Sequence, residues 1–536
     1  MQTEENEQGT ERLNELVANL QHTDCFDHSV ERFEQVETHI SIVLLTGPFA
    51  YKFKKPLDLE FLDFSTLDRR REACRTELQL NRRTAPELYV DVVTITGSVE
   101  DPVLDGEGAP IEYAVKMKEF PQEARMDNVV ERGAVTDDMI DRTADEVSDL
   151  HLKSDVVELD RGMSEAEHQR EELDQTYEQL TELLEQLSVS TETADRVYDW
   201  GKRFLEDHGA HFDNRAQEGR IHDLHGDLHL QNIAWFDDRP VFYDCIEFND
   251  AYRHIDPINE LAFLTMDLER IGTRAHSWRL TNRYLEKTGD YTGVQMLPYF
   301  KAYRAMVRAM VAGIKHVGSR CEQEDVAVSD RMTSYLQQMD APLSRGPSVL
   351  VLMYGVSASG KTTISQQLLQ RLGGIRVRSD VERRRIHDLN PMESEVSSYD
   401  VEEGLYSEES THRTYERLQL VADDLLDSGY PVFVDATFLD RTHRKWFHEL
   451  AERREVPIRI VHPEAPEEEL RRRIRERTRA EEPILTDADE QVLNHQLESG
   501  DELTSEEQNI TISVTPGAGS VDQVVERIRN CGRAES

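Results

Sequence analysis

Cysteine and positive charge are both scarce in this chain. Its 536 residues include five cysteines and 62 lysines and arginines, against 106 aspartates and glutamates, which gives a formal net charge of −44 at pH 7. Single, scattered cysteines without C-x-x-C spacing exclude a secreted disulfide framework and indicate a reducing compartment. An acidic surface repels nucleic acid and anionic membranes, so any contact with nucleic acid must be local.

Long apolar runs are missing as well. The N-terminus, MQTEENEQGTERLNELV, has neither the basic start nor the apolar stretch of a signal peptide. No apolar run approaches the roughly 20 residues that a bilayer span requires. We therefore expect a soluble, cytoplasmic protein without a membrane partner.

The order of strand and helix patterns divides the chain into parts. Strand patterns around one embedded helix begin near residue 38, and after about Val129 the patterns are mostly helical. APLSRGPS has the proline, glycine and serine of a linker, and beyond it strands and helices alternate, as in a parallel sheet wrapped by helices. We predict an N-terminal extension, an α+β domain with a small β-rich lobe and a helical lobe, a linker, and an α/β domain, at residues 1–29, 30–340, 341–348 and 349–536.

A phosphate-binding motif opens the last part. GVSASGKTT follows an apolar strand and begins a helix, which is the context that the G-x-x-x-x-G-K-[ST] pattern requires. Its glycines let backbone N–H groups cradle phosphates, Lys361 reaches the outer phosphate oxygens, and the hydroxyl of Thr362 can hold Mg²⁺. The motif predicts binding of ATP and Mg²⁺. The residues expected to bind are Gly355, Ser357, Ala358, Ser359, Gly360, Lys361, Thr362 and Thr363.

Three further segments carry charges suited to the same site. In VFVDATF, Asp435 ends an apolar strand, where it can support Mg²⁺ or simply cap the strand. In RVRSDVERRR, Asp380 can accept the proton of a substrate hydroxyl while Arg383 grips a substrate anion; the alternative is a helix cap beside surface arginines. The helix LRRRIRERTR is too basic for an acidic protein to carry by chance, and its arginines can neutralise phosphate charge.

These segments resemble the small P-loop kinases of the gluconate kinase, shikimate kinase and polynucleotide kinase 5′-domain type. The resemblance covers residues 349–536 and is based on the Walker A loop, the aspartate after the second strand and the basic helix. It implies phosphoryl transfer from ATP to a hydroxyl, with Asp380 as base and Arg473 or Arg477 as lid residues. Because a very large class shares the Walker A loop, the motif specifies the nucleotide far better than the acceptor.

A second candidate site lies in IHDLHGDLHLQNIAWFDDRPVFYDCIEFND, residues 221–250. Its three histidines are His222, His225 and His229. They could face a zinc ion, but the H-E-x-x-H order and a cysteine pair are both missing. Counted from Asp227, the segment gives D-x-x-x-x-N ending at Asn232, then a short hairpin, then Asp244. In kinase-type sites the first aspartate accepts the hydroxyl proton, and the asparagine and second aspartate hold Mg²⁺.

This segment resembles the aminoglycoside and choline phosphotransferase branch of the kinase fold, whose loop reads H-G-D-x-x-x-x-N. The resemblance implies a strand-rich lobe with a lysine and a helical glutamate that serve the phosphates. FAYKFKKP places Lys52 and Lys54 on one face of a strand, and Lys52 is preferred. The helix RRREACRTELQL contains Glu72 and Glu77, and Glu77 is preferred; a surface lysine and a solvated glutamate are the alternative. LLTGPFA has a single glycine where protein kinases carry a glycine-rich loop, which phosphotransferases of the aminoglycoside type also lack.

Together the two parts resemble a bacterial fusion of an aminoglycoside phosphotransferase-like domain with a P-loop kinase-like domain. The leading hypothesis is an ATP-dependent phosphotransferase with two ATP sites, each acting on a hydroxyl of a small molecule. One alternative is a nucleotide-binding regulatory or scaffold protein with one inactive kinase domain. The other is polynucleotide 5′-hydroxyl kinase activity in the C-terminal domain, where arginines cluster at 383–385 and 471–479. The sequence identifies neither acceptor, nor the oligomeric state.

Overall fold

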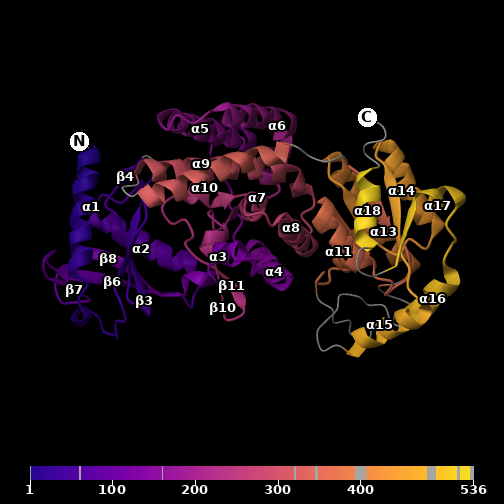
Figure 1. The fold of residues 1–536 in the computed structure, drawn as a ribbon, viewed down its shortest axis with the longest axis horizontal. Coiled ribbons are helices and arrows are strands. Elements are labelled where there is room, and N and C mark those ends of the chain that lie inside the picture. Colours follow the sequence, from indigo (N-terminus) through magenta and orange to yellow (C-terminus); the bar gives the residue numbers. More distant parts are fainter. Residues whose placement is uncertain are drawn as a thin grey trace. The chain divides into compact units, whose positions relative to one another are not determined.

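The computed structural model of the chain divides into two compact units (Figure 1). Its described residues are 2–59, 62–159, 161–318, 322–343, 348–392, 405, 407–479, 490–515 and 520–530. The N-terminal unit consists of Met1–Arg142, Asp149–Asp267 and Tyr303–Met339. The C-terminal unit consists of Thr143–Ser148, Leu268–Ala302 and Asp340–Ser536. Part of the predicted linker, 344–347, lies outside the described residues, and the boundaries of independently folding domains stay predictions.

A six-stranded antiparallel sheet with the order β1-β2-β3-β8-β6-β7 forms the first part of the N-terminal unit. Its strands are β1 Glu34–Glu37, β2 Ser41–Leu45, β3 Phe49–Lys54, β6 Tyr89–Gly97, β7 Pro102–Leu104 and β8 Glu112–Lys118. The hairpin of β4 (Asp58–Leu59) and β5 (Leu62–Asp63) lies outside this sheet.

Alternation along β3 separates the core from the charged side chains. Because successive side chains point to opposite faces of a sheet, Tyr51 and Phe53 join the apolar core with α1 (Gln2–Asn19). Lys52 and Lys54 point to the other face, where α2 (Leu67–Asn81) packs. The predicted N-terminal extension thus contributes a helix to the core of the sheet.

The rest of the N-terminal unit is mostly helical, with two short antiparallel strand pairs. The helices are α3 Met126–Glu131, α4 Asp137–Lys153, α5 Glu165–Gln186, α6 Glu192–Gln217, α7 Pro257–Arg270, α9 Leu297–Gly318 and α10 Glu322–Asp340. Helices α4, α7 and α9 are divided between the two units. The strand pairs are β9 His222–Asp223 with β12 His254–Ile255, and β10 Ile233–Phe236 with β11 Arg239–Phe242.

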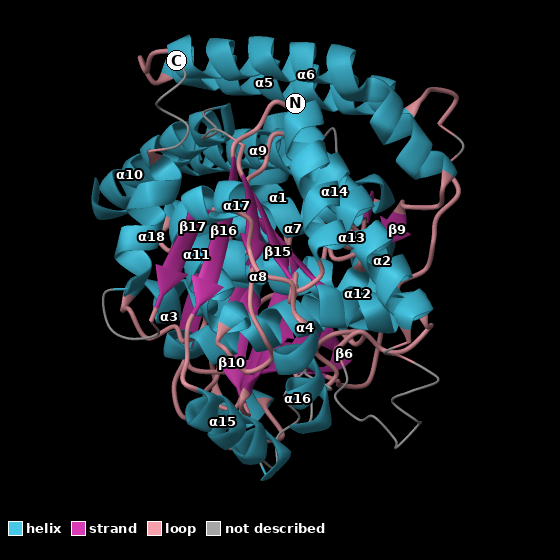
Figure 2. Ribbon diagram, turned by 90° about the vertical axis from the view of Figure 1, so that its right-hand side faces the viewer, coloured by secondary structure: helices cyan, strands magenta, loops and turns pink. Residues whose placement is uncertain are grey.

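A five-stranded parallel sheet with the order β14-β15-β13-β16-β17 is the centre of the C-terminal unit. The strands are β13 Leu350–Met353, β14 Ile375–Arg378, β15 Val432–Asp435, β16 Ile458–Pro463 and β17 Thr511–Val514. The helices are α8 Arg274–Thr288, α11 Lys361–Leu372, α12 Ser379–Ile386, α13 Glu408–Asp427, α14 Arg441–Arg453, α15 Glu467–Arg479, α16 Glu490–Ser499, α17 Ser505–Ile510 and α18 Ser520–Arg529 (Figure 2). Central strands such as β13 are buried along their whole length, as expected between layers of helices. The predicted fold class, an α+β region followed by an α/β P-loop domain, is confirmed.

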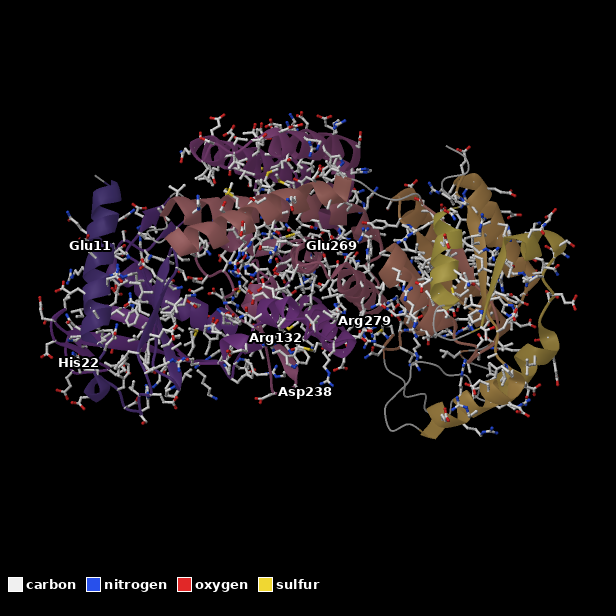
Figure 3. All side chains as sticks on the ribbon, viewed as in Figure 1. Glu11, His22, Arg132, Asp238, Glu269 and Arg279 are labelled. Carbon is white, nitrogen blue, oxygen red and sulfur yellow. The ribbon has the colours of Figure 1, made fainter. Side chains whose placement is uncertain are left out.

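The surface carries the acidic side chains that the composition predicts. Glu11 on α1 and Asp238 in the turn between β10 and β11 are both exposed (Figure 3). Within the described ranges, no helix is both long and apolar enough to cross a membrane.

Candidate active sites

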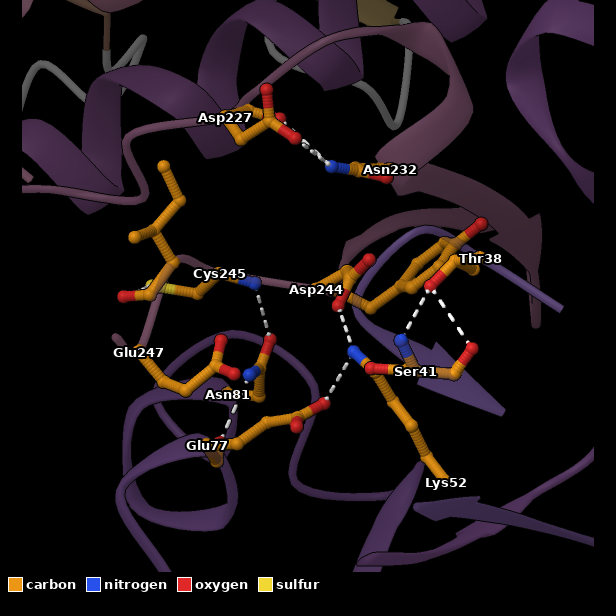
Figure 4. A network of polar contacts seen from close by, with 12 residues as sticks. Thr38, Ser41, Lys52, Glu77, Asn81, Asp227, Asn232, Asp244, Cys245 and Glu247 are labelled. Carbon is orange, nitrogen blue, oxygen red and sulfur yellow. Dashed lines mark hydrogen bonds and ion pairs between the residues drawn. The ribbon is translucent and has the colours of Figure 1, made fainter. Parts of the chain in front are cut away.

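The first candidate site lies in the N-terminal unit and is centred on Lys52 of β3. The Nζ atom lies 2.9 Å from Glu77 Oε1 on α2, and it also contacts the carboxylate of Asp244 (Figure 4). Burial alone would lower the pKa of Lys52, but Asp244 and Glu77 raise it well above its usual value. Glu72, the other glutamate considered, is exposed. The structure therefore brings together the lysine and the glutamate that the sequence analysis preferred and one of its candidate Mg²⁺ ligands, Asp244.

Lys54, two residues further along β3, belongs to the same charge cluster. Its ammonium is fully buried and contacts the carboxylates of Glu77 and Glu247. Burial would lower the pKa of Lys54, but Glu247 and Glu77 raise it. Burial also raises the pKa of Glu247, against the opposing effect of Lys54. A second buried lysine–carboxylate pair therefore shares Glu77 with the first.

Backbone contacts hold the loop that carries Asp227. Gly226 has φ +83°, and its N–H donates to Glu260 Oε1 over 2.7 Å. A Cβ atom on Gly226 would lie 2.7 Å from the Tyr252 carbonyl oxygen, so only glycine fits this position. His225 Nε2 donates to the Tyr243 carbonyl oxygen over 3.0 Å. The histidine and glycine of H-G-D thus fix the loop that ends at the aspartate.

Asp227 forms a hydrogen-bonded pair with Asn232. Asn232 Nδ2 donates to the Asp227 carbonyl oxygen over 2.9 Å and to its Oδ2 over 3.1 Å (Figure 4). Burial would raise the pKa of Asp227, but His229 and Arg308 outweigh it and hold the pKa below its usual value. The Asp227 side chain is 34% exposed. It is therefore both ionised and accessible, as a base for a hydroxyl must be.

The ligand chemistry of Asn232 and Asp244 fits Mg²⁺. The Asp244 side chain is 45% exposed; burial would raise its pKa, but Lys52 outweighs this and holds the pKa below its usual value. The side-chain nitrogen of Asn232, Nδ2, donates to Asp227. The side-chain oxygen, Oδ1, is therefore the atom of this amide that can bind a cation. Carboxylate and amide oxygens are hard ligands of the kind that Mg²⁺ binds.

The three histidines of this segment have partners other than a metal. His222 Nδ1 lies 3.0 Å from Ser154 Oγ. His225 donates to a carbonyl oxygen, and His229 Nδ1 accepts from the Gln231 N–H over 3.2 Å. In the described part of the chain, no three His, Cys, Asp or Glu side chains are grouped so that they could hold a metal ion. The contacts that are present therefore favour a catalytic loop over the alternative zinc site.

The turn between β1 and β2 carries His39, whose pKa is lowered. Desolvation and the charge of Lys315 lower the pKa of His39 to about 4, whereas Asp227 and Asp244 act in the opposite direction. His39 is therefore neutral near pH 7. The single glycine of the segment LLTGPFA, Gly47, lies in the turn between β2 and β3.

The second candidate site lies in the C-terminal unit, where β13 leads into α11. Gly355, Ala358 and Gly360 have φ values of +130°, +64° and +107°, so the backbone turns repeatedly before α11 begins at Lys361. Lys361 Nζ donates to the Val356 carbonyl oxygen over 2.9 Å. A turn of this kind at the N-terminus of a helix directs backbone N–H groups toward an anion.

Two observations test whether this loop fits phosphate. Ser359 Oγ is buried without a hydrogen-bond partner among the described residues. The Ser357 N–H donates to Gln496 Oε1 of α16 over 2.7 Å, so an acceptor oxygen already lies where a phosphate oxygen would bind. Thr362 and Thr363 are exposed at the start of α11. The residues present therefore fit a phosphate group.

Asp435 lies at the end of β15 next to the strand that leads into the P-loop. It pairs in register with Met353, the last residue of β13. Its Oδ2 accepts a hydrogen bond from Ser365 Oγ of α11 over 3.2 Å. A carboxylate in this position, with the exposed hydroxyl of Thr362 at the start of the same helix, has the oxygen chemistry that Mg²⁺ requires.

Asp380 stands in the first turn of α12 and is bound by a neighbouring arginine. Arg378 Nη2 lies 2.7 Å from Asp380 Oδ2, and Arg378 Nε lies 3.2 Å from Oδ1. Arg383, expected to grip a substrate anion, donates to the Leu405 carbonyl oxygen over 2.8 Å and to Thr411 Oγ1 over 3.2 Å, and its role toward an anion stays a prediction. Arg378 is an arginine in contact with the candidate base that the sequence analysis did not name.

Arg473 of α15 contacts the P-loop backbone. Its Nη1 donates to the carbonyl oxygens of Ala358 and Ser359, over 3.0 and 3.3 Å. The side chain of Arg477 and residues 480–489 lie outside the described residues. Apolar side chains from α15, α16 and the P-loop form one cluster beside Arg473, made of Ala358, Leu470, Ile474 and Leu493.

Comparison with known proteins is informative for the C-terminal unit. Residues 350–503 match the family model of the AAA domain. The chain is 29% identical over 434 residues to an uncharacterized protein of Mycobacterium tuberculosis. The aligned region covers 80% of this chain and 83% of that protein.

Similar solved structures include a choline kinase of Cryptosporidium parvum, at 10% identity, covering 62% of this chain and 95% of that chain, with a TM-score of 0.39. Another is a gluconokinase of Sinorhizobium meliloti, at 19% identity, covering 35% of this chain and 94% of that chain, with a TM-score of 0.24. Likenesses at these TM-scores establish neither an activity nor a substrate.

Three residues at the two sites were not named by the sequence analysis. Glu247 follows Asp244 by three residues, and Arg378 precedes Asp380 by two, so a local search around each aspartate could have found them. No local pattern marks the third, Gln496, since its contact with Ser357 depends on how distant segments fold.

Proposed function

We propose that the chain is an ATP-dependent phosphotransferase with two ATP sites, each transferring a phosphoryl group to a hydroxyl of a small molecule. The observation that carries this proposal is the Lys52 ammonium, which contacts both Glu77 and Asp244. The same unit pairs Asp227 with Asn232. A buried lysine held by two carboxylates, beside an ionised aspartate and an asparagine, is a charge arrangement that serves phosphoryl transfer from ATP in kinase-type sites.

In the N-terminal site, the chain's own residues bind phosphate and move one proton. Lys52 binds phosphate oxygens, and Glu77 holds its ammonium in place. Asp227 accepts the proton of the acceptor hydroxyl as that oxygen bonds to the γ-phosphorus and the bond to ADP breaks. Mg²⁺, held by Asn232 and Asp244 when bound, would supply neutralisation of phosphate charge.

In the C-terminal site, the P-loop backbone and Lys361 bind the phosphates of the nucleotide. Asp380 accepts the proton of the second acceptor hydroxyl, and Arg473, which already contacts the P-loop carbonyl oxygens, neutralises developing charge. Thr362 and Asp435 would hold the Mg²⁺ of this site. The match of residues 350–503 to the AAA domain supports nucleotide binding here.

Four forms of the full chain test this proposal: wild type, Asp227→Asn, Lys361→Ala and the double variant. Labelled magnesium ATP is supplied with a small-molecule extract, and both ADP formation and labelled products are measured. We expect each single variant to lose one set of products and the double variant to lose at least about 10²-fold of total turnover. ATP consumption at the wild-type rate by the double variant contradicts both site assignments.

A nucleotide-binding regulatory role of the C-terminal unit is the second candidate. It is favoured by the contacts that Gln496 and the Val356 carbonyl oxygen make with the Ser357 N–H and the Lys361 ammonium. If the C-terminal unit has this regulatory role, ATP raises the Tm of the wild-type chain more than that of the Lys361→Ala chain. The Lys361→Ala substitution then removes no labelled product.

A further inference from the structure

Helix α8 lies in the C-terminal unit although its sequence belongs to the predicted domain at 30–340. It packs against α11 and β14 (Figure 1). Asn282 Nδ2 donates to the Gly374 carbonyl oxygen over 2.9 Å, and its Oδ1 accepts from the Arg376 N–H over 2.6 Å. The side-chain amide thus satisfies backbone groups at the edge of the parallel sheet, as a further strand would.

One turn further along α8, Glu286 contacts two arginines of β14. Arg376 Nε donates to Glu286 Oε1 over 2.8 Å, and Arg378 Nη1 donates to Oε2 over 3.3 Å. The Glu286 side chain is only 1% exposed. A buried carboxylate between two guanidinium groups holds both of them in fixed orientations.

Arg378 contacts both Glu286 and Asp380 and so connects the two carboxylates. Its Nη1 reaches Glu286, while its Nε and Nη2 reach the two oxygens of Asp380. Burial would lower the pKa of Arg378, but Asp380 and Glu286 raise it. The Asp380 side chain is 26% exposed, whereas that of Arg378 is 7% exposed. A continuous chain of charge contacts therefore runs from the buried Glu286 to the accessible carboxylate of Asp380.

We propose that Glu286 is a positioning residue for the candidate base Asp380 and acts through Arg378. The inference depends on the function proposed above for the C-terminal site. It adds that this site is completed by a helix encoded before the P-loop region, so that residues 349–536 alone lack one of its parts. Without Glu286, Arg378 loses one of the carboxylates that hold its guanidinium and can turn with Asp380 away from the acceptor hydroxyl. A displacement of about 1 Å can cost about 10²-fold in rate.

The test uses the full chain with Asp227→Asn, so that the remaining ATP consumption reports the P-loop site. Magnesium ATP is the substrate and water replaces the alcohol as acceptor. We expect Glu286→Gln to lower kcat at least about tenfold and to change KM for ATP less than about twofold, because Glu286 contacts the arginines of β14 and reaches the P-loop helix only through Arg376. Glu286→Asp, which keeps the charge, recovers part of kcat.

Asn282→Ala is the matched control from the same helix. It removes a contact with the backbone of β14 but leaves the charge chain intact, so its Tm falls while kcat per folded molecule is retained. An equal loss of kcat in Asn282→Ala and Glu286→Gln, or a wild-type kcat in folded Glu286→Gln, overturns the inference. If Glu286→Gln does not fold, Glu286→Gln with Arg376→Met leaves no buried unpaired charge, and the same loss of kcat is expected.

The proposed function fails in a different way. If Lys361→Ala leaves ATP consumption of the Asp227→Asn chain unchanged, the C-terminal site has no turnover, and both the function and the role of Glu286 are rejected. If Lys361→Ala abolishes consumption and Glu286→Gln does not reduce it, only the role of Glu286 is rejected.

Discussion

The two candidate sites are built in different ways. The N-terminal site is made of side chains from segments far apart in the chain, since Lys52 and Asp244 are separated by 192 positions. The C-terminal phosphate site is made chiefly of backbone in one segment, from Gly355 to Thr363. We infer that single charges determine the first site, whereas local chain geometry and the side chains that cover the P-loop determine the second.

The largest expected effects come from replacing the two lysines of β3, one of which should mainly affect stability and the other turnover. Lys54→Met leaves Glu77 and Glu247 buried without one of their cations, so we expect the N-terminal unit to lose about 3–5 kcal/mol of stability. Lys52→Met affects the more exposed Asp244, so it should lower N-terminal turnover at least about 10²-fold with a smaller loss of stability. Chemical unfolding and labelled product formation, both in the Lys361→Ala chain, measure the two effects.

A compensated variant sharpens this comparison. Lys54→Met combined with Glu247→Gln removes both charges of the buried pair, and we expect it to recover much of the stability lost in Lys54→Met. Equal stability of Lys54→Met and Lys52→Met would mean that the buried pair has no structural role, and the two lysines would then be interchangeable.

The same contrast explains how much the sequence predicts. The P-loop is predictable because all its parts are adjacent, and the strand before it and the helix after it are marked by their own patterns. The Lys52–Glu77 pair is predictable only as a choice among neighbours, because strand periodicity cannot distinguish Lys52 from Lys54. The structure shows that both lysines contact Glu77, which no periodicity could indicate.

Glu286 and Gln496 could not be predicted from the sequence because their contacts join distant segments of the chain. Glu286 precedes Arg378 by 92 positions, and helical patterns assign it to the first domain rather than to the P-loop unit. Gln496 follows Ser357 by 139 positions and carries no charge that would draw attention to it. Both contacts depend on which helix covers which edge of the sheet, and that choice is a property of tertiary packing.

An intermediate effect concerns pH, and it tests the charges of the N-terminal site. The pKa values of Asp227 and Asp244 lie below their usual values, that of Lys52 lies above, and that of His39 is about 4. None of these groups changes charge between about pH 5.5 and 8, so turnover by the Lys361→Ala chain should vary less than about twofold over that range. Initial rates in constant ionic strength buffers measure this.

The stability of the N-terminal unit should also depend on pH through the lowered pKa values of Asp227 and Asp244. Because both carboxylates have lower pKa values folded than unfolded, their stabilising contributions are complete above about pH 5 and are lost as the pH falls below about 4. A rate profile with a midpoint between pH 5.5 and 7 would instead assign the base to another group and contradict the role of Asp227.

The smallest expected effect lies in the second site and involves one hydrogen bond. Gln496 Oε1 accepts from the Ser357 N–H, and a phosphate oxygen must displace it. Because such a bond contributes about 0.5–1.5 kcal/mol, Gln496→Ala should tighten binding of magnesium ADP by about 2–10-fold, whereas Gln496→Glu should weaken it through charge repulsion. Titration calorimetry on a Lys52→Met chain, in which the N-terminal site is impaired, measures both. Weaker binding by Gln496→Ala would show that Gln496 contacts the bound nucleotide and does not compete with it, and the P-loop would then be a site whose side chains matter as much as its backbone.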